Sequence, residues 1–152
     1  MRKLFIISFI VIIASFAVVS PIEKVVEPPS AADLSLEEKV GQMFMIRYSG
    51  YFYQENSYTY RRMKRLIEER KIGGVIQFFG SIHGSVENLN ELQRISTLPL
   101  LIASDYERGV GQLLDGGTLF PTNMALAATN SPRLAYKQGR ITAKEGRAVG
   151  VH

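Results

Sequence analysis

The sequence predicts an α/β fold with a parallel sheet, and two observations carry this prediction. Helical and extended patterns alternate after residue 34, in the order helix, strand, helix, strand, helix, strand, helix. The three extended runs are almost wholly apolar, as expected when helices cover both faces of a sheet. Because three strands make only a small sheet, we expect the chain to be the front piece of a longer protein.

The first 20 residues have the pattern of an export signal. Two basic residues, Arg2 and Lys3, precede an apolar stretch from Leu4 to Val19. That stretch is close to the shortest spanning helix, which needs about 17 residues. We therefore expect residues 1–20 to be a signal peptide or an uncleaved signal anchor, and the protein to be exported, either periplasmic or secreted.

A linker and a capped helix follow the export signal. Residues 21–33 contain three prolines and are predicted to be a linker. Ser35 and Glu38 form the capping-box pattern, so a helix is expected from there, with apolar residues at helical spacing through Met43. The run 42–48 then predicts a short apolar strand, and residues 49–60 a long loop.

The middle of the chain predicts a second helix and a buried strand. Apolar residues share one face from Tyr60 to Lys71, and basic and acidic residues occupy the others. The basic residues there either form an anion-binding patch or lie on a solvated face with Lys64–Glu68 and Arg65–Glu69 pairs, which is the interpretation we favour. The two glycines and apolar run of "GGVIQFF" predict a strand from Gly74 to Phe79.

Two further helices and one strand complete the pattern. Ser85 is predicted to cap a helix whose inward residues extend to Ile95. Pro99 opens the apolar run "PLLIAS", which predicts the third strand. A second long loop is expected at 115–130, followed by a helix at 133–148 that begins after Ser131 and Pro132 and is closed by Gly150.

Composition excludes several classes of function. The chain has no cysteine, which excludes disulfides, thiolate metal sites, a cysteine nucleophile and an acylated lipoprotein cysteine. The net charge is +4, and subtracting the charges of Arg2 and Lys3 leaves +2, too little to argue for nucleic acid. We expect no metal and no cofactor, and membrane contact only through an uncleaved anchor.

The third predicted strand ends on an acid. Asp105 follows "PLLIAS", and Glu107 and Arg108 come directly behind it. Sites in parallel α/β folds form at the carboxyl ends of strands, and a carboxylate there can accept hydrogen bonds from two hydroxyls. Asp105 therefore either contacts a sugar, a metal or a cationic ligand, or it caps a turn or pairs with Arg108.

Four blocks in order resemble one known family. The runs "LSLEEKVGQMFMI", "GGVIQF", "PLLIASDYERGVG" and "FPTNMALAATNSPRLAYKQGRITAKEGRAVGVH" are similar to the amino-terminal domain of glycoside hydrolase family 3. The resemblance covers residues 34–152. It implies a (β/α)8 barrel, of which this chain holds the first three to four units, and an exo-acting, retaining mechanism on β-linked sugars.

The resemblance assigns roles to three residues. Asp105 matches the aspartate that holds hydroxyls of the terminal sugar, and Glu107 matches a neighbouring acid expected to order the loop. Arg108 stands where the hexosaminidase pattern has glycine, so it either contacts the sugar from a shifted position or pairs with an acid. That pattern also has arginines where Val110 and Leu113 stand, which leaves the exact substrate open. Glu145 and Arg147 match a charged stretch of helix expected to be structural.

The Asp-x-Glu-x-Gly pattern resembles the β-N-acetylhexosaminidase branch, which implies action on oligosaccharides or cell-wall fragments. The alternatives are a β-glucosidase or β-xylosidase of the same family, a non-catalytic carbohydrate-binding barrel, and a membrane-anchored interaction protein. The family's late aspartate nucleophile and its histidine loop with a Lys-His-Phe-type motif have no match here. His83, expected in a surface loop, and His152, matched to the residue before the fourth strand, fit neither role, so no catalytic residue is assigned in this chain.

Overall fold

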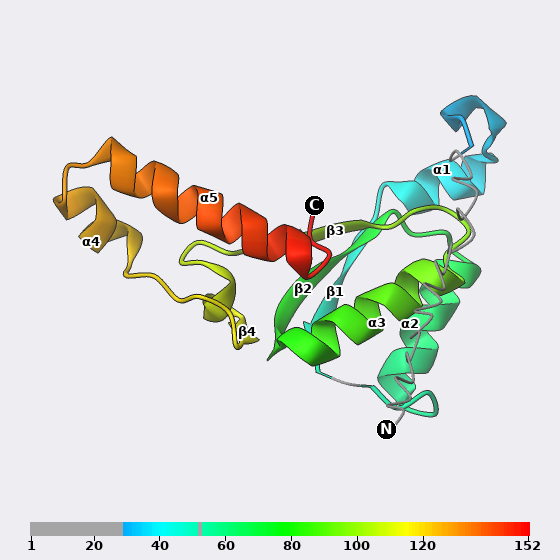
Figure 1. Ribbon diagram of the computed structural model, residues 1–152. Helices are drawn as coiled ribbons and strands as arrows, with labels where there is room; N and C mark the ends of the chain where they lie inside the picture. Colours follow the sequence, from blue (N-terminus) through cyan, green and yellow to red (C-terminus); the bar gives the residue numbers. More distant parts are fainter. Residues whose placement is uncertain (1–28, 52) are drawn as a thin grey trace, which may run out of the picture.

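A computed structural model describes residues 29–51 and 53–152 (Figure 1). The predicted signal segment, 1–20, and most of the predicted linker lie outside the described residues. The end of that linker forms a single 3-10 turn at Ala31–Asp33, which the side chain of Ser30 caps. No helix among the described residues is long and apolar enough to cross a membrane.

Three parallel strands form the sheet, in the order β1-β2-β3. They are β1 (Met45–Gly50), β2 (Gly74–Ser81) and β3 (Leu101–Ser104). A short fourth strand, β4 (Leu114–Asp115), pairs with the end of β2 beyond the reach of β3. The sheet is parallel and unclosed, as the alternation of helices and strands predicted, and β4 is an addition that two residues of sequence could not indicate.

In the described part of the chain, five helices accompany the strands. They are α1 (Leu36–Gln42), α2 (Tyr58–Glu68), α3 (Ile82–Ile95), α4 (Asn123–Ala128) and α5 (Pro132–Ala148), with a 3-10 turn at Val110–Gln112. The capping box of α1 is present, since Ser35 accepts from the Glu38 backbone and Glu38 accepts from the Ser35 backbone. The predicted boundaries of α5 are correct to within one residue, and Gly150 has a φ of 88° beyond its end.

Several predicted boundaries are wrong. Strand β1 starts at Met45 rather than at residue 42, and α2 starts at Tyr58, where Ser57 caps it, so the loop before it is shorter than expected. Ser85 does not cap α3; Ser81 accepts from the Gly84 backbone in that role, and Ser85 is buried inside the helix. Strand β2 continues to Ser81, which leaves no loop between β2 and α3.

The first turn of α3 therefore takes up His83, which we expected in a loop; the residue is exposed, as expected. The predicted loop 115–130 contains α4. This helix is built mostly of small residues, so it shows no apolar period, and its start at the capping residue Thr122 has little to mark it in the sequence.

The main core lies between one face of the sheet and helices α2 and α3. Every second residue of the strands points to this side. The core cluster there contains Val75 and Ile102 of the sheet, Ile67 of α2 and Leu89 of α3. The opposite face of the sheet is open in the described part of the chain, and Leu101 on it is 54% exposed. Figure 1 shows α2 and α3 side by side on one side of the strands, while α4 and α5 extend away from them.

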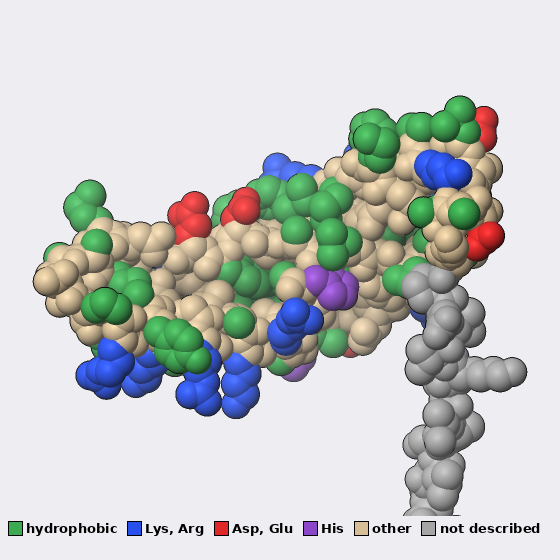
Figure 2. All heavy atoms as spheres, turned by 90° about the horizontal axis from the view of Figure 1, so that it is seen from above, with side chains coloured by type: hydrophobic (Ala, Val, Ile, Leu, Met, Phe, Trp, Pro, Cys, Tyr) green, Lys and Arg blue, Asp and Glu red, His purple; other side chains and the backbone are tan. Residues whose placement is uncertain are grey.

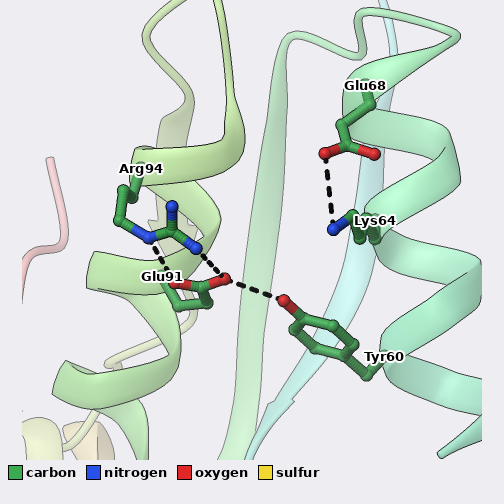
Figure 3. A network of polar contacts seen from close by, with 5 residues as sticks. All are labelled: Tyr60, Lys64, Glu68, Glu91 and Arg94. Atoms are coloured by element: carbon green, nitrogen blue, oxygen red, sulfur yellow. Dashed lines mark hydrogen bonds and ion pairs between the residues drawn. The ribbon is translucent and has the colours of Figure 1, made fainter. Parts of the chain in front are cut away.

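A polar network joins α2 to α3 at the surface (Figure 3). The Glu91 carboxylate accepts from Nε and Nη2 of Arg94, both at 2.7 Å, and from the Tyr60 hydroxyl at 2.8 Å. The hydrogen bond from Arg94, followed by that from Tyr60, holds the pKa of Glu91 below its ordinary value. The pKa of Tyr60 is raised to about 12, mainly by burial and secondly by the hydrogen bond to Glu91. The proton in the Tyr60–Glu91 bond therefore stays on the phenol. The predicted Lys64–Glu68 pair is present at 3.7 Å, whereas no ion pair forms between Arg65 and Glu69.

Candidate functional site

Asp105 lies directly after the last residue of β3, at the carboxyl end of the sheet. Ser104 pairs with Gln77, so the next residue along, Asp105, lies beside Phe78 of β2. Side chains alternate between the two faces of the sheet along β3 and just beyond it. Ile102, three positions before Asp105, lies in the core, and the hydroxyl of Tyr106, the next residue, reaches Gln77, so both point to the helix side. Asp105 therefore belongs to the opposite, open face, and it is exposed.

Tyr106 anchors the chain immediately after Asp105. Its hydroxyl donates a hydrogen bond of 2.7 Å to Oε1 of Gln77, a fully buried polar side chain on β2. Burial raises the pKa of Tyr106, which keeps the phenol protonated and able to donate. The backbone of Asp105 is thus held between the paired strand on one side and a buried hydrogen bond on the other.

The loop that follows folds back on itself through Arg108 and Phe120. The backbone N–H of Phe120 donates to the Arg108 carbonyl at 2.8 Å, and Nε of Arg108 donates to the Phe120 carbonyl at 3.2 Å. Between them, Gly109 has a φ of 87°, and a Cβ there would lie 2.4 Å from the Thr118 carbonyl oxygen. The path of the loop therefore requires glycine at residue 109, because any other residue there would be strained.

Arg108 and Glu107 contribute to this loop in different ways. The half-buried Arg108 donates to a backbone carbonyl, and no ion pair joins it to an acid within 29–51 and 53–152. The Glu107 side chain is exposed, and the residue meets α5 through its backbone carbonyl, which accepts from Nε2 of Gln138 at 3.4 Å. The sugar contact expected of Arg108 and the loop-ordering role expected of Glu107 stay predictions.

Glu145, on α5, holds the same loop by hydrogen bonds to Thr118. Its carboxylate accepts from the backbone N–H of Thr118 at 3.0 Å and from the Thr118 hydroxyl at 2.5 Å. This contact agrees with the structural role expected for the charged stretch of that helix. Arg147, its partner in the motif, is exposed.

Two residues that the sequence did not single out share the open face with Asp105. The guanidinium of Arg47, on β1, lies 4.7 Å from the ring centroid of Phe78, on β2. Arg47 pairs in register with Ile76, so its side chain leans toward the carboxyl end of the sheet to reach Phe78. The period-two pattern of "MIRYSG" could have placed Arg47 opposite the buried Tyr48.

Neither histidine lies beside Asp105. His83 is on the helix side of the sheet, and His152 hydrogen-bonds to the backbone of Ile102. His83 is exposed on α3, on the helix side of the sheet. His152 continues the parallel ladder beside β3, because its backbone N–H donates to the Ile102 carbonyl and its Nδ1 accepts from the Ile102 N–H at 2.9 Å. This places residue 152 where the strand after β3 would begin, in agreement with the match to the residue before a fourth strand.

A groove of about 500 Å³ lies between the loop after β3 and α5, with Glu107, Gln138 and His152 among its lining residues. It is at the free edge of β3, and the open face that carries Asp105 lies to one side of it. Within the described ranges, no three His, Asp or Glu side chains come together in a way that could hold a metal ion.

Comparison with known proteins places the chain in one family. The model of the glycosyl hydrolase family 3 N terminal domain matches residues 35–152. A curated relative from Cellulomonas fimi, named beta-N-acetylglucosaminidase/beta-glucosidase, is 28% identical over 128 residues, which cover 80% of this chain and 20% of that protein.

Two solved structures of beta-glucoside phosphorylase BglX, one of them bound to 2FGlc, share this part of the fold. The bound form has a TM-score of 0.67 at 29% identity and the other 0.62 at 30% identity. The matched region covers 79% of this chain and 21% of the bound structure's chain, and 80% of this chain and 20% of the other structure's chain. The chain thus spans about a fifth of the length of the proteins it matches, and its unclosed sheet corresponds to the first part of their barrel domain.

Proposed function

Because the chain belongs to glycosyl hydrolase family 3, we propose that the full-length protein is an exo-acting, retaining β-glycosidase. Its preferred substrates are oligosaccharides or cell-wall fragments with a terminal β-linked N-acetylhexosamine. The nucleophile and the acid/base belong to residues outside this chain. The 152 residues contribute the first wall of the sugar pocket and, in the proposal, one of its binding acids.

The exposed position of Asp105 at the carboxyl end of β3 carries the proposal. A carboxylate that no basic side chain of the described residues pairs with keeps its oxygens available to hydroxyl donors. It can accept from two adjacent sugar hydroxyls at once, and such charge-assisted bonds are stronger than neutral ones. Arg108 approaches the same ligand from the neighbouring loop, and Glu107 supports that loop.

The hydrogen bonds between Asp105 and the sugar hydroxyls contribute to both steps of retaining hydrolysis. A carboxylate nucleophile displaces the leaving group to form a covalent glycosyl-enzyme, and water then breaks that bond. Hydroxyl contacts that tighten as the ring distorts toward the oxocarbenium-like state lower the barrier of each step. Asp105 thereby contributes to kcat as well as to substrate affinity.

A second candidate is action on β-glucosides, with phosphate rather than water as the acceptor. It is favoured by the two solved structures named beta-glucoside phosphorylase, and the Cellulomonas fimi relative carries both glycosidase names. In that reaction, a phosphate oxygen attacks the anomeric carbon of the glycosyl-enzyme, the bond to the carboxylate breaks, and a sugar phosphate leaves.

Assays of the full-length protein separate these candidates. We expect release of 4-nitrophenol from 4-nitrophenyl β-N-acetylglucosaminide faster than from the β-glucoside, with a free sugar as product and no dependence on phosphate. A sugar phosphate formed only when phosphate is added would favour the phosphorylase. Absence of turnover, together with measurable sugar binding, would favour a non-catalytic carbohydrate-binding barrel.

We also propose that the protein is exported, on the basis of residues 1–20. Fractionation of cells that express the full-length gene tests this. The protein is expected outside the cytoplasm, and a soluble cytosolic protein that retains Met1 would contradict the proposal.

A further inference from the structure

The outer face of α5 carries a row of basic side chains. The row, here called the α5 basic stripe, consists of Arg133, Lys137, Arg140, Lys144 and Arg147. At about 3.6 residues per turn, the five fall within an arc of about 80°, and a rise of about 1.5 Å per residue spreads them over about 21 Å. All five are exposed.

Most of the stripe lies on the side of α5 that faces away from the fold, although Lys137 also borders a cleft between α4 and α5 and Arg147 borders the groove beside β3. On the opposite side of α5, Gly146 is buried and Val149, just past the helix, packs with Val110 and Leu114 in a second core cluster. Figure 2 shows Lys and Arg side chains gathered along one side of the part of the molecule that α4 and α5 form. No ion pair within the described residues ties these five basic side chains to the rest of the fold.

Acids do not neutralise the stripe. The one acid of α5 is Glu145, and its carboxylate is taken up by Thr118. The ion pairs of the described residues, Lys64–Glu68 and Arg94–Glu91, both lie elsewhere. Five like charges at i,i+3 and i,i+4 repel one another along an isolated helix, so a counter-charge outside the described residues would relieve this repulsion.

Helix α2 shows what an ordinary solvated basic face of this protein looks like. Its exposed Arg61, Arg62 and Arg65 are accompanied by Glu68 and Glu69 on the same helix and its end, and Lys64 pairs with Glu68 at 3.7 Å. Charges of both signs are interspersed there, whereas on the α5 basic stripe only one sign is present. The two helices thus provide a matched comparison within one chain.

We propose that the α5 basic stripe docks the protein on the surface of a membrane that contains anionic phospholipids. A straight row of cations suits a flat anionic surface, and each basic residue near such a surface strengthens binding. Tyr136, 74% exposed beside the stripe, supplies an aromatic ring of the kind that is enriched at membrane–water interfaces. If residues 1–20 stay uncleaved as a signal anchor, the apolar stretch from Leu4 to Val19 holds the exported protein at a membrane.

Binding of the full-length protein to vesicles tests the proposal. The probes are phosphatidylcholine vesicles with and without 30% phosphatidylglycerol, and the pure phosphatidylcholine vesicles report any contribution of the apolar amino-terminal segment. We expect tighter binding to the anionic vesicles that weakens as salt is added. The triple variant Lys137→Gln, Arg140→Gln, Lys144→Gln should weaken binding to the anionic vesicles by about a hundredfold, at about fivefold per basic residue.

The matched control is the triple variant Arg61→Gln, Arg62→Gln, Arg65→Gln, which removes the same charge from α2 and should weaken binding much less. Tyr136→Cys, made in a full-length background from which any other cysteine has been replaced and labelled with an environment-sensitive dye, reports contact of α5 with the bilayer directly. The dye emission should shift only with anionic vesicles. Equal losses for the two triple variants, an unshifted dye, or binding of a DNA oligonucleotide without any preference for anionic vesicles would each overturn the proposal.

Discussion

The hydroxyl of Tyr106 donates a hydrogen bond of 2.7 Å to Oε1 of the buried Gln77. This bond joins the residue after Asp105 to the middle of the sheet, 29 positions away in sequence. The candidate sugar-binding acid is therefore flanked by a paired strand on one side and by a buried polar contact on the other. Rigid support of this kind is what a precise hydroxyl-binding carboxylate needs.

Tyr106→Phe should destabilise the protein and loosen the position of Asp105. The substitution leaves Oε1 of Gln77 buried without its partner, which typically costs about 1–3 kcal/mol. We expect a lower Tm and a smaller kcat/KM in the full-length protein. Tyr58→Phe, at a 76% exposed tyrosine, is the control. Equal melting temperatures for the two variants would show that the Gln77 contact contributes nothing.

Gly109→Ala should damage the loop behind the site. The residue has a φ of 87°, and the new methyl would lie 2.4 Å from the Thr118 carbonyl oxygen, so backbone strain of about 1–3 kcal/mol and a steric clash act together. Gly139→Ala is a sharp control, because nothing lies within 4 Å of its Cβ position on α5. That variant should stabilise the helix by roughly 0.5–1 kcal/mol. Thermal melts in which both variants behave alike would contradict the loop geometry.

Glu91→Gln should reduce stability at neutral pH, and the loss should fade in acid. Hydrogen bonds from Arg94 and then Tyr60 hold the folded-state pKa of Glu91 below its ordinary value. The carboxylate's contribution is thus fully present above that ordinary value, about 4.3, and is lost as pH falls through the lowered pKa. Because Arg94 is 71% exposed, the effect at pH 7 should stay below about 1 kcal/mol.

Melting temperatures from pH 7 to pH 3 measure this effect, with Glu87→Gln on the same helix as control. The gap between wild type and Glu91→Gln is expected to narrow below about pH 4.3. A gap that stays constant or widens in acid would mean that the network in Figure 3 does not stabilise the fold through the ionised carboxylate.

The 152-residue chain expressed alone should be poorly folded or aggregated. Its sheet has free edges and an open face on which Leu101 is 54% exposed, and Phe79 near the end of β2 is 52% exposed. Unpaired strand edges and uncovered apolar faces promote association. Sedimentation and thermal unfolding check this, and a monomer with one sharp transition would count against an incomplete barrel.

Local sequence signals predicted the elements whose cause is local. The capping box of Ser35 and Glu38, the apolar run of β2, and the proline start and glycine end of α5 each depend on neighbouring residues. The sequence pattern predicts Ser85 as the cap of α3, whereas Ser81 caps it. Both serines precede the same apolar period, and only the length of β2 decides which of them begins the helix.

The contacts that shape the candidate site could not be predicted in the same way. Arg108 meets Phe120 across 12 positions, Thr118 meets Glu145 across 27, and Tyr106 meets Gln77 across 29. These pairings follow from the packing of the chain and have no periodic signature. The position of Asp105 at a strand end was predictable because an apolar run that stops on an acid marks such an end.

The kinetic effect of Asp105→Ala in the full-length protein tests the central claim most directly. A charge-assisted bond to a sugar hydroxyl is worth about 1.5–3 kcal/mol, so its loss should lower kcat/KM by roughly ten- to a few hundredfold. The loss should appear as a lower kcat and a higher KM. The Tm should be nearly unchanged, since the side chain is exposed. Arg108→Ala should lower kcat/KM less than Asp105→Ala does. Glu107→Ala should change Tm little, because the Glu107 side chain is exposed and the contact with α5 is made by its backbone carbonyl, which alanine keeps. Near wild-type kcat/KM for Asp105→Ala on both the β-N-acetylglucosaminide and the β-glucoside would contradict the account and leave Asp105 as a turn residue.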